Sequence, residues 1–330
     1  FQSLLHVQPI AVTVFGDRYA FDQFHDEVGS TCTGGSNVQQ PGDIGMVHHR
    51  QGLSFGSKTG GSQLSPAPDV GNKLEVIAID EASLQQLGEW PWPRSYLGVV
   101  IKQLNKYGAR TVGLALPLHT PQSEFGVKRL DSMRDTYEGK YEKTVKDILF
   151  RARQRLDTDG ALAASLKRSD NTVLAISYGL NTDVRRGSGS ASDRTLQSYA
   201  LSDFPAEAND WSGLIPSVLG RGIPELTQAQ PPLPMLAKYS AAGMLDESVS
   251  TDRSGLATPL VLKFGDHYYP SFSLMFAAKS LKVKPADIMI NPGQDISLGG
   301  TGLYTDPAYR LYPHLYSTSD DAPAFRQHSF

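Results

Sequence analysis

The sequence has a single cysteine, Cys32, in 330 residues. One cysteine excludes an internal disulfide framework and a zinc site built from several thiolates. The chain also lacks a run of about 18 apolar residues, the length that a membrane-spanning helix needs. Positive charge is not in excess, because 31 lysines and arginines stand against 34 aspartates and glutamates and the net charge is −3. This balance does not favour binding to nucleic acid or to an anionic membrane surface.

Motifs for common enzyme chemistry are missing as well. No G-x-G-x-x-G follows a predicted strand, and G-x-x-x-x-G-K-S/T does not occur, so nucleotide binding has no support. No G-x-S-x-G elbow stands between a predicted strand and a helix, because the match GLSFG (52–56) lies in the segment rich in glycine and serine, so a serine nucleophile has no support either. His48 and His49 are adjacent and would point apart on a strand, while His119, His267 and His314 are isolated. A metal site needs several ligands that converge. We therefore expect no metal, no cofactor and no catalytic residues in this chain.

The pattern that the sequence does contain is clearest between residues 73 and 118. Leu74–Ile79 is an apolar run typical of a strand buried on both faces. Glu81–Leu87 predicts a short helix, and Ser95–Tyr107 predicts a longer one with apolar residues at helical spacing, ended by Gly108. Thr111–Leu116 is a second buried strand. Strand, helix and strand at this spacing indicate a right-handed βαβ unit.

Further elements follow along the chain. Thr144–Leu156 and Gly160–Lys167 predict helices, the latter capped by Asp157 or Thr158, and Thr172–Tyr178 predicts a third buried strand. From these patterns we expect Val76–Ile79, Thr111–Leu116 and Thr172–Ala175 to be neighbouring parallel strands.

The last third of the chain predicts smaller elements. Leu256–Phe264 and His267–Tyr269 flank Gly265 and Asp266 and predict a hairpin, and Ser271–Leu281 predicts a helix. Asp295–Leu298 predicts a last strand, and residues 304–330 predict an extended loop. The fold class is thus α/β: a mostly parallel sheet with helices on both faces, an antiparallel hairpin and long loop insertions.

Residues 1–72 differ from the rest in composition. Asp17–Val28 predicts an amphipathic helix, and Gly29–Gly71 is rich in glycine, serine, proline and glutamine, with too few apolar residues for a core of its own. We therefore divide the chain into an N-terminal helix-and-loop segment, residues 1–72, and a main domain, residues 73–330.

Several of these segments, in this order, resemble a known family. They are IAIDEASL (77–84), GEWPWPR (88–94), YGARTVGL (107–114), DGALAASLKRSDNTVLA (159–175), TDRSGLATPLVLKFGDHYYPSFSL (251–274) and ISLGGTGLYTDPAYRLYPHLY (296–316), with DRYAFDQF (17–24) similar to the family's first helix. The family is the second type of CHASE domain, an extracytoplasmic sensory domain associated with cyclases and histidine kinases. The family usually carries an acidic residue in the second strand, where this chain has Ala115.

The resemblance implies a sensor or interaction domain on the periplasmic or extracellular face of a bacterial inner membrane. Such a domain binds a small ligand or a protein partner and passes a conformational change to membrane helices outside this chain; a homo-oligomer is compatible with it. Two alternatives stay open. One is a non-catalytic assembly subunit that uses the domain for protein contacts, and the other is a soluble hydrolase that uses Asp80 and Glu81 as acid and base.

Five residues form the predicted ligand site. Asp80 and Glu81 follow the first strand, and ligands bind at the carboxyl ends of strands in open α/β sheets. Asp80 would equally serve as a helix cap. Trp90, Trp92 and Arg94 would form an aromatic and cationic surface, or the indoles would pack on the sheet with at least one of them buried. In the packing hypothesis Arg94 stays near solvent or pairs with an acid such as Asp80 or Glu89.

Overall fold

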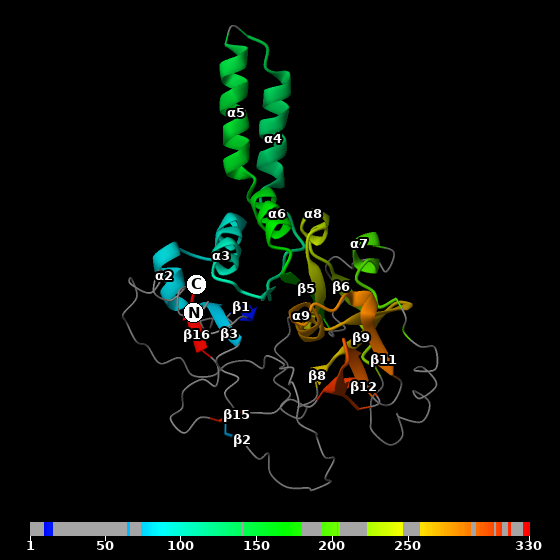
Figure 1. Cartoon of the computed structure of the whole chain (residues 1–330). Coiled ribbons are helices and arrows are strands. Elements are labelled where there is room, and N and C mark those ends of the chain that lie inside the picture. The colour runs from blue at the N-terminus through cyan, green and yellow to red at the C-terminus, as the bar shows by residue number, and fades with distance from the viewer. Residues whose placement is uncertain are drawn as a thin grey trace, which may run out of the picture.

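The computed structural model describes residues 10–15, 65–66, 74–139, 141–179, 193–202, 204, 223–246, 258–291, 295–306, 308–311, 316–317 and 326–330. Their helices and strands form one large sheet with helices on both faces, smaller sheets beside it, and a helical hairpin that projects from the body (Figure 1). The predicted fold class is confirmed.

Seven strands make up the large sheet, in the order β16-β3-β1-β4-β5-β6, with β7 also paired to β5. Their bounds are β1 Ile10–Phe15, β3 Leu74–Ile79, β4 Thr111–Leu114, β5 Thr172–Gly179, β6 Gln228–Gln230, β7 Ala241–Asp246 and β16 Arg326–Ser329. Strands β16, β3, β4, β5 and β7 run in one direction, and β1 and β6 run in the other. The sheet is therefore mostly parallel in strand direction, although β1 interrupts it.

Strand β1 lies between the first two predicted strands. It is antiparallel to both, with Ile10 opposite Ile79 in β3 and Val12 opposite Leu114 in β4. The second and third predicted strands, β4 and β5, are parallel neighbours as expected. The prediction that β3 and β4 are neighbours was wrong, because a segment about 60 residues earlier in the chain supplies the strand between them, and no local pattern announces such a long-range pairing.

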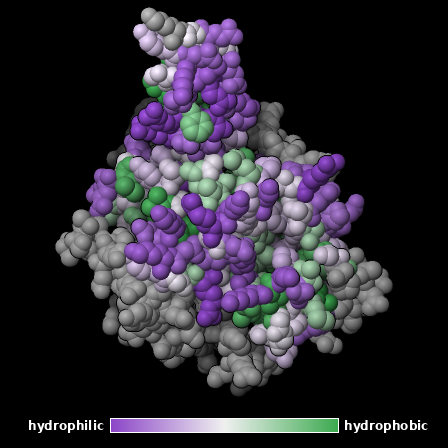
Figure 2. Space-filling view, turned by 45° about the horizontal axis from the view of Figure 1, so that its top comes forward, coloured by the Kyte–Doolittle hydropathy of each residue, from purple (hydrophilic) through white to green (hydrophobic). Residues whose placement is uncertain are grey.

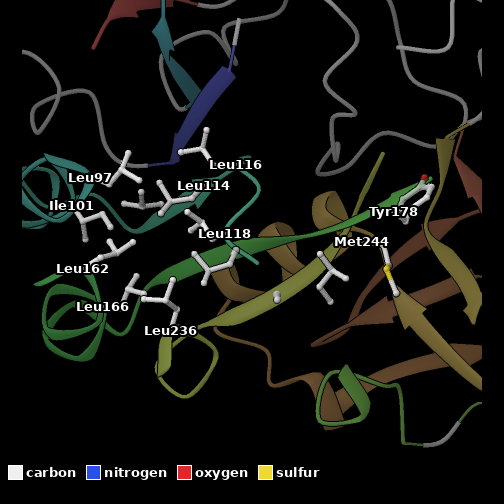
Figure 3. Packing of buried hydrophobic residues seen from close by; sticks show 14 of the residues in the cluster. Leu97, Ile101, Leu114, Leu116, Leu118, Leu162, Leu166, Tyr178, Leu236 and Met244 are labelled. Carbon is white, nitrogen blue, oxygen red and sulfur yellow. The ribbon is translucent and has the colours of Figure 1, made fainter. Parts of the chain in front are cut away.

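The sheet buries side chains on both faces. In β5, Leu174, Ile176 and Tyr178 belong to one apolar cluster, and the alternate residues Val173 and Ala175 belong to another, as the two-residue period of a strand requires. Helices α3 (Arg94–Lys106) and α6 (Thr158–Ser169) cover the first face, and α9 (Phe272–Ser280) covers the second. Figure 3 shows the first cluster, with side chains from α3 and α6 directed at the sheet.

Helix α3 is built as its sequence predicts. Leu97, Ile101 and Leu104 are buried, and Gly98 allows close packing on α6, because a Cβ there would lie 2.9 Å from Ser165 Oγ. Gly108, at φ 83°, ends the helix: its N–H donates to Asn105 O and that of Ala109 donates to Leu104 O.

The second face carries the predicted hairpin and helix. Strands β9 (Val261–Phe264) and β10 (His267–Pro270) are antiparallel around Gly265, which has φ 58°. The Ser271 side chain accepts from Leu274 N and caps α9. Both predictions are confirmed.

Smaller elements complete the described part of the chain. They are β2 Ser65–Pro66, α2 Glu81–Leu87, α7 Arg194–Gln197, α8 Pro234–Ala237, β8 Thr258–Pro259, a 3-10 turn at Pro285–Asp287, β11 Ile288–Asn291, β12 Asp295–Leu298, β13 Thr301–Tyr304, β14 Arg310–Leu311 and β15 Tyr316–Ser317. The strand predicted at Asp295–Leu298 is confirmed as β12. It is the middle strand of a three-stranded antiparallel sheet with β11 and β13.

The projecting hairpin consists of α4 (Glu124–Thr136) and α5 (Glu142–Leu156). The sequence predicted α5 but left α4 unassigned. Neither helix buries a residue. Figure 1 shows the pair standing clear of the body above α6.

We expected residues 304–330 to form an extended loop, but the last of them, Arg326–Ser329, form strand β16. Strand β16 joins the edge of the large sheet, parallel to β3. Its pairing partner lies about 250 residues earlier, so the segment has no local signal beyond its own short length. The predicted helix Asp17–Val28 and most of Gly29–Gly71 lie outside the described residues.

Candidate functional site at the carboxyl edge of the sheet

Asp80 directly follows β3 and caps α2. Its Oδ1 accepts from Ser83 N at 3.0 Å, while the Ser83 hydroxyl accepts from Asp80 N at 2.9 Å, which forms a reciprocal capping box. Ser329 Oγ in β16 also donates to Asp80 Oδ1, at 2.6 Å. Burial alone would raise the pKa of Asp80, but the hydrogen bonds from Ser329 and Ser83 outweigh it and hold the pKa below its usual value.

Glu81 is placed differently from Asp80. It is exposed in the first turn of α2, where its Oε1 accepts from Gln85 Nε2 at 3.2 Å. The Asp80 carboxylate is held by Ser83 and Ser329, so the two acids do not share hydrogen-bonding partners. This geometry gives no support to a joint role as catalytic acid and base.

The tryptophan-proline loop packs on the sheet edge. Trp92 is only 4% exposed, and its Nε1 donates to Gly88 O at 2.7 Å. Trp90 is half-buried against the same cluster, with the two indoles edge to face at 5.6 Å between centroids. The ring of Phe330 lies 5.0 Å from that of Trp92. The prediction that at least one indole is buried is confirmed, and Trp92 is that indole.

Arg94 does not stay near solvent. It is 7% exposed, and its Nη1 forms an ion pair with Asp159 Oδ1 at 2.5 Å while its Nη2 donates to Thr120 O at 2.7 Å. The expectation of an acidic partner was right, but the partner is neither Asp80 nor Glu89. Asp159 lies 65 residues further on, in the first turn of α6, where a carboxylate is favourable. No local pattern links the two positions.

Gln122 joins this ion pair to the loop. Its Nε2 donates to Trp92 O, and its Oε1 accepts from Arg94 N and Thr158 Oγ1. The backbone N–H of Gln122 in turn donates to Asp159 Oδ2 at 2.8 Å. The loop, the start of the hairpin and the start of α6 are therefore held by one polar network.

An open groove of about 340 Å³ lies over this network. It is lined by Pro91, Pro93, Gln122, Ser123, Phe125, Gly126, Leu156 and Thr158. Phe125 is 87% exposed at its rim. Because Gln122 and Thr158 already bond to each other, the groove offers mainly apolar contacts. Its size is near the lower end for ligand sites.

Both ends of the described chain reach this edge. Ile10 is opposite Ile79, and Phe330 N donates to Ala78 O at 2.9 Å. Strands β1 and β16 thus lie on either side of β3 and both have one end beside Asp80. In β3, buried Glu75 also contacts His328 of β16, with 2.8 Å between Oε2 and Nε2.

Among the described residues, no group of three or more histidine, cysteine, aspartate or glutamate side chains converges as a metal site would require. In the same part of the chain, no helix is both long and apolar enough to cross a bilayer.

The features of this edge define an α/β domain whose first and last described strands, capped strand β3 and rigid aromatic loop meet at one place. The CHASE2 domain family model matches residues 53–330, and the chain belongs to this family. CHASE2 is an extracytoplasmic sensory, non-catalytic domain of signalling proteins. No curated protein and no solved structure matched the chain.

The structure brings together Asp80, Trp92 and Arg94 at one edge, with Trp90 beside them and Glu81 on the outer side of α2. That these five residues contact a ligand stays a prediction. Sequence reasoning missed Asp159, Gln122 and Ser329, which hold these side chains in place. Of these three residues, only Asp159 could have been noticed in the sequence, because it is an acid in the first turn of a predicted helix.

Proposed function

We propose that this CHASE2 domain is the extracytoplasmic sensor of a bacterial membrane signalling protein. It binds a ligand or partner at the carboxyl edge of the sheet and passes the change on through β1 and β16. The observation that carries the proposal is the position of these two strands: both flank β3 with one end beside Asp80, and Phe330, the residue after β16, contacts Trp92 of the tryptophan-proline loop.

The edge is suited to relay a change. A shift of the loop moves Trp92, which contacts Phe330, and a shift at the start of α2 moves Asp80, which holds Ser329. Ser329 is the last residue of β16, and Phe330 directly follows it. A ligand that binds one arrangement better shifts the population toward it. Membrane helices outside this chain would receive the change.

The groove is the proposed binding site, and its lining indicates a ligand with an apolar part. Pro91, Pro93, Phe125 and Leu156 supply apolar surface, while Trp90, next to Pro91 in the loop, is a predicted site residue that is only half-buried. Trp92 and Arg94 act by holding the loop, and Asp80 by holding α2 and β16, rather than as the main contacts.

Fluorescence tests the groove directly. The chain has three tryptophans, so Trp211→Phe leaves Trp90 and Trp92 as the reporters. The apolar dye 8-anilinonaphthalene-1-sulfonate should bind saturably and quench them. Phe125→Asp should weaken dye binding by about tenfold or more, because the bound dye would cover the exposed Phe125 ring, and burial of a phenylalanine side chain contributes about 1.5–3 kcal/mol.

Phe150→Asp is the matched control, since Phe150 is also an exposed phenylalanine of the hairpin but does not line the groove. It should leave dye binding unchanged. Equal affinity in wild type and Phe125→Asp, or an equal loss in both variants, would refute the groove as the binding site.

A further inference from the structure

The groove at the base of the α4–α5 hairpin has two walls that belong to different parts of the chain. Pro91 and Pro93 of the tryptophan-proline loop form one of them. The other, which we call the hairpin wall, consists of Ser123, Phe125, Gly126 and Leu156. Figure 2 shows hydrophobic groups near the base of the hairpin, while the hairpin itself is mostly hydrophilic on this face. A ligand in the groove would touch two segments that are separate in sequence, so its effect on the loop depends on how the walls are joined.

Gln122 joins the two walls with one side chain. By its backbone it belongs to the hairpin wall, since it lies just before α4 and its N–H donates to Asp159 Oδ2 at 2.8 Å. Its carboxamide reaches the loop, where Nε2 donates to Trp92 O at 2.7 Å and Oε1 accepts from Arg94 N at 2.8 Å. The carboxamide therefore pairs with the backbone on both sides of the proline between these two residues.

The other polar residues of the groove do not make this connection. Among the described contacts, no side-chain hydrogen bond of Ser123 or Thr158 reaches the loop. Thr158 Oγ1 donates to Gln122 Oε1 at 2.8 Å, so it is linked to the loop only through Gln122. The buried pair of Arg94 and Asp159 joins the starts of α3 and α6, whereas Gln122 holds the backbone of the loop itself.

The stiffness of the loop lets a shift at the Trp92 carbonyl reach the indole. Proline fixes φ at positions 91 and 93, and a residue before proline is confined to extended conformations. Trp92 therefore has little freedom to absorb a shift by backbone rotation, and its ring centroid lies 5.0 Å from that of Phe330. Phe330 N in turn donates to Ala78 O at 2.9 Å, directly after β16. A continuous set of contacts leads from the groove to the end of β16.

We propose that Gln122 is a positioning residue that couples the groove to β16, by passing the effect of a ligand on the hairpin wall to Trp92. This role rests on the proposed function, because it requires a ligand in the groove. Gln122 lines the groove and is exposed, so a ligand that contacts both walls would cover its carboxamide. Hydrogen bonds that are shielded from water are stronger. An occupied groove should therefore hold Trp92 more firmly and make local opening of β16 less frequent.

Hydrogen exchange of residues 326–330, with and without 8-anilinonaphthalene-1-sulfonate, tests this coupling on the whole chain. The dye is used at saturation, so differences in affinity between variants do not enter. In the wild type, the dye should slow exchange at residues 326–330 by about threefold relative to β5 and β7, because β16 opens locally less often. Gln122→Met keeps the length of the side chain but loses both hydrogen bonds to the loop. In this variant the dye should still bind and should leave exchange at residues 326–330 unchanged.

Thr158→Val is the matched control. It removes one hydrogen bond from the same carboxamide and alters the same groove, but it leaves both bonds to the loop in place. The dye should slow exchange at residues 326–330 in this variant as it does in the wild type. Each variant is compared with itself, with and without dye, so a change in basal stability does not affect the comparison.

Gln122→Glu is a second test of the coupling. A carboxylate keeps an acceptor for Arg94 N but has no N–H to donate to Trp92 O. With saturating dye, Gln122→Glu should therefore respond as Gln122→Met does, although one replacement is charged and the other is apolar. Circular dichroism of all variants checks that the fold is retained.

Three results would overturn the role of Gln122 while the proposed function stands. The first is an equal effect of the dye in the wild type and in both Gln122 variants, which would mean that the ligand acts on Pro91 and Pro93 directly. The second is a loss of dye binding in Gln122→Met, which would make Gln122 a ligand contact. The third is a loss of the dye effect in Thr158→Val. If bound dye leaves exchange at residues 326–330 of the wild type unchanged or faster, the relay in the proposed function fails, and the role of Gln122 fails with it.

Discussion

Individual side chains at the carboxyl edge join parts of the chain that are far apart in sequence. Asp80 contacts Ser329 across 249 residues, and Arg94 contacts Asp159 across 65. The Arg94–Asp159 pair is buried, so loss of either partner would leave an uncompensated charge in the interior. Residues predicted as a ligand site thus have a second task, which is to hold the edge together.

Trp92 should contribute more to stability than Trp90. Trp92→Ala removes a buried indole and its hydrogen bond to Gly88 O, and should lower the free energy of unfolding by about 3–5 kcal/mol. Trp90→Ala should cost less, because Trp90 is only half-buried. Urea denaturation of both variants measures the difference. Equal losses, or none in Trp92→Ala, would contradict the packing described for the loop.

The lowered pKa of Asp80 links stability to pH. A carboxylate whose pKa is lower in the folded state contributes stability above its unfolded pKa of about 3.9, and loses it as the pH falls through the folded value. Asp80→Asn keeps a cap acceptor but removes the charge. The loss of stability relative to wild type should therefore be largest near neutral pH and should shrink below about pH 4.

Denaturant unfolding at several pH values checks this dependence. Glu81→Gln, at the next position on the exposed side of α2, controls for the general effect of removing a negative charge. A difference between wild type and Asp80→Asn that is as large at pH 3 as at pH 7 would disagree with the proposed role of the Ser329 and Ser83 hydrogen bonds.

At the scale of elements, close backbone packing fixes α9 on the sheet. A Cβ on Gly243 in β7 would lie 2.5 Å from Ser271 O and 2.7 Å from Phe272 Cα. Backbone atoms cannot turn away as a side chain can, so Gly243→Ala should destabilise the protein by about 1–3 kcal/mol. Gly126→Ala is the control, because its Cβ would meet only the end of the Leu156 side chain. Thermal unfolding should show a lower melting temperature in Gly243→Ala alone.

The elements that the sequence predicted correctly have a local cause. Helix α3 follows from apolar residues at helical spacing and from Gly108, and the β9–β10 hairpin follows from Gly265 and Asp266. Strand β1 and strand β16 have their partners elsewhere in the chain, so their own residues do not show where they belong. Helix α4 was missed because it is highly charged and buries nothing.

The same distinction applies to the site. That Asp80 caps a helix was predictable, because an acid before a helical segment is a local signal. The partner of Arg94 was not predictable, since Asp159 comes near only after α3 and α6 pack together. Long-range contacts of this kind become visible only in the fold.

Over the whole molecule, β3 is the strand that connects the proposed sensing edge to the first and last described strands, β1 and β16. Strand β1 pairs along all of β3 on one side, and β16 pairs along most of it on the other. The α4–α5 hairpin projects from the body on the side away from β1 and β16 (Figure 1).

If the edge relays a change, the tryptophan-proline loop must control how firmly β16 is held, since Trp92 contacts Phe330. Hydrogen exchange of residues 326–330 in Trp92→Phe tests it most directly, because this variant keeps an aromatic ring but loses the indole and its hydrogen bond. Gly243→Ala serves as a destabilised control on the other face. We expect hydrogen exchange at residues 326–330 to rise about tenfold more in Trp92→Phe than in Gly243→Ala, which corresponds to a free energy of local opening lower by about 1.4 kcal/mol. Exchange in β5 and β7 of Trp92→Phe should stay as it is in the wild type. Exchange at 326–330 that rises no more than in the control would contradict the account.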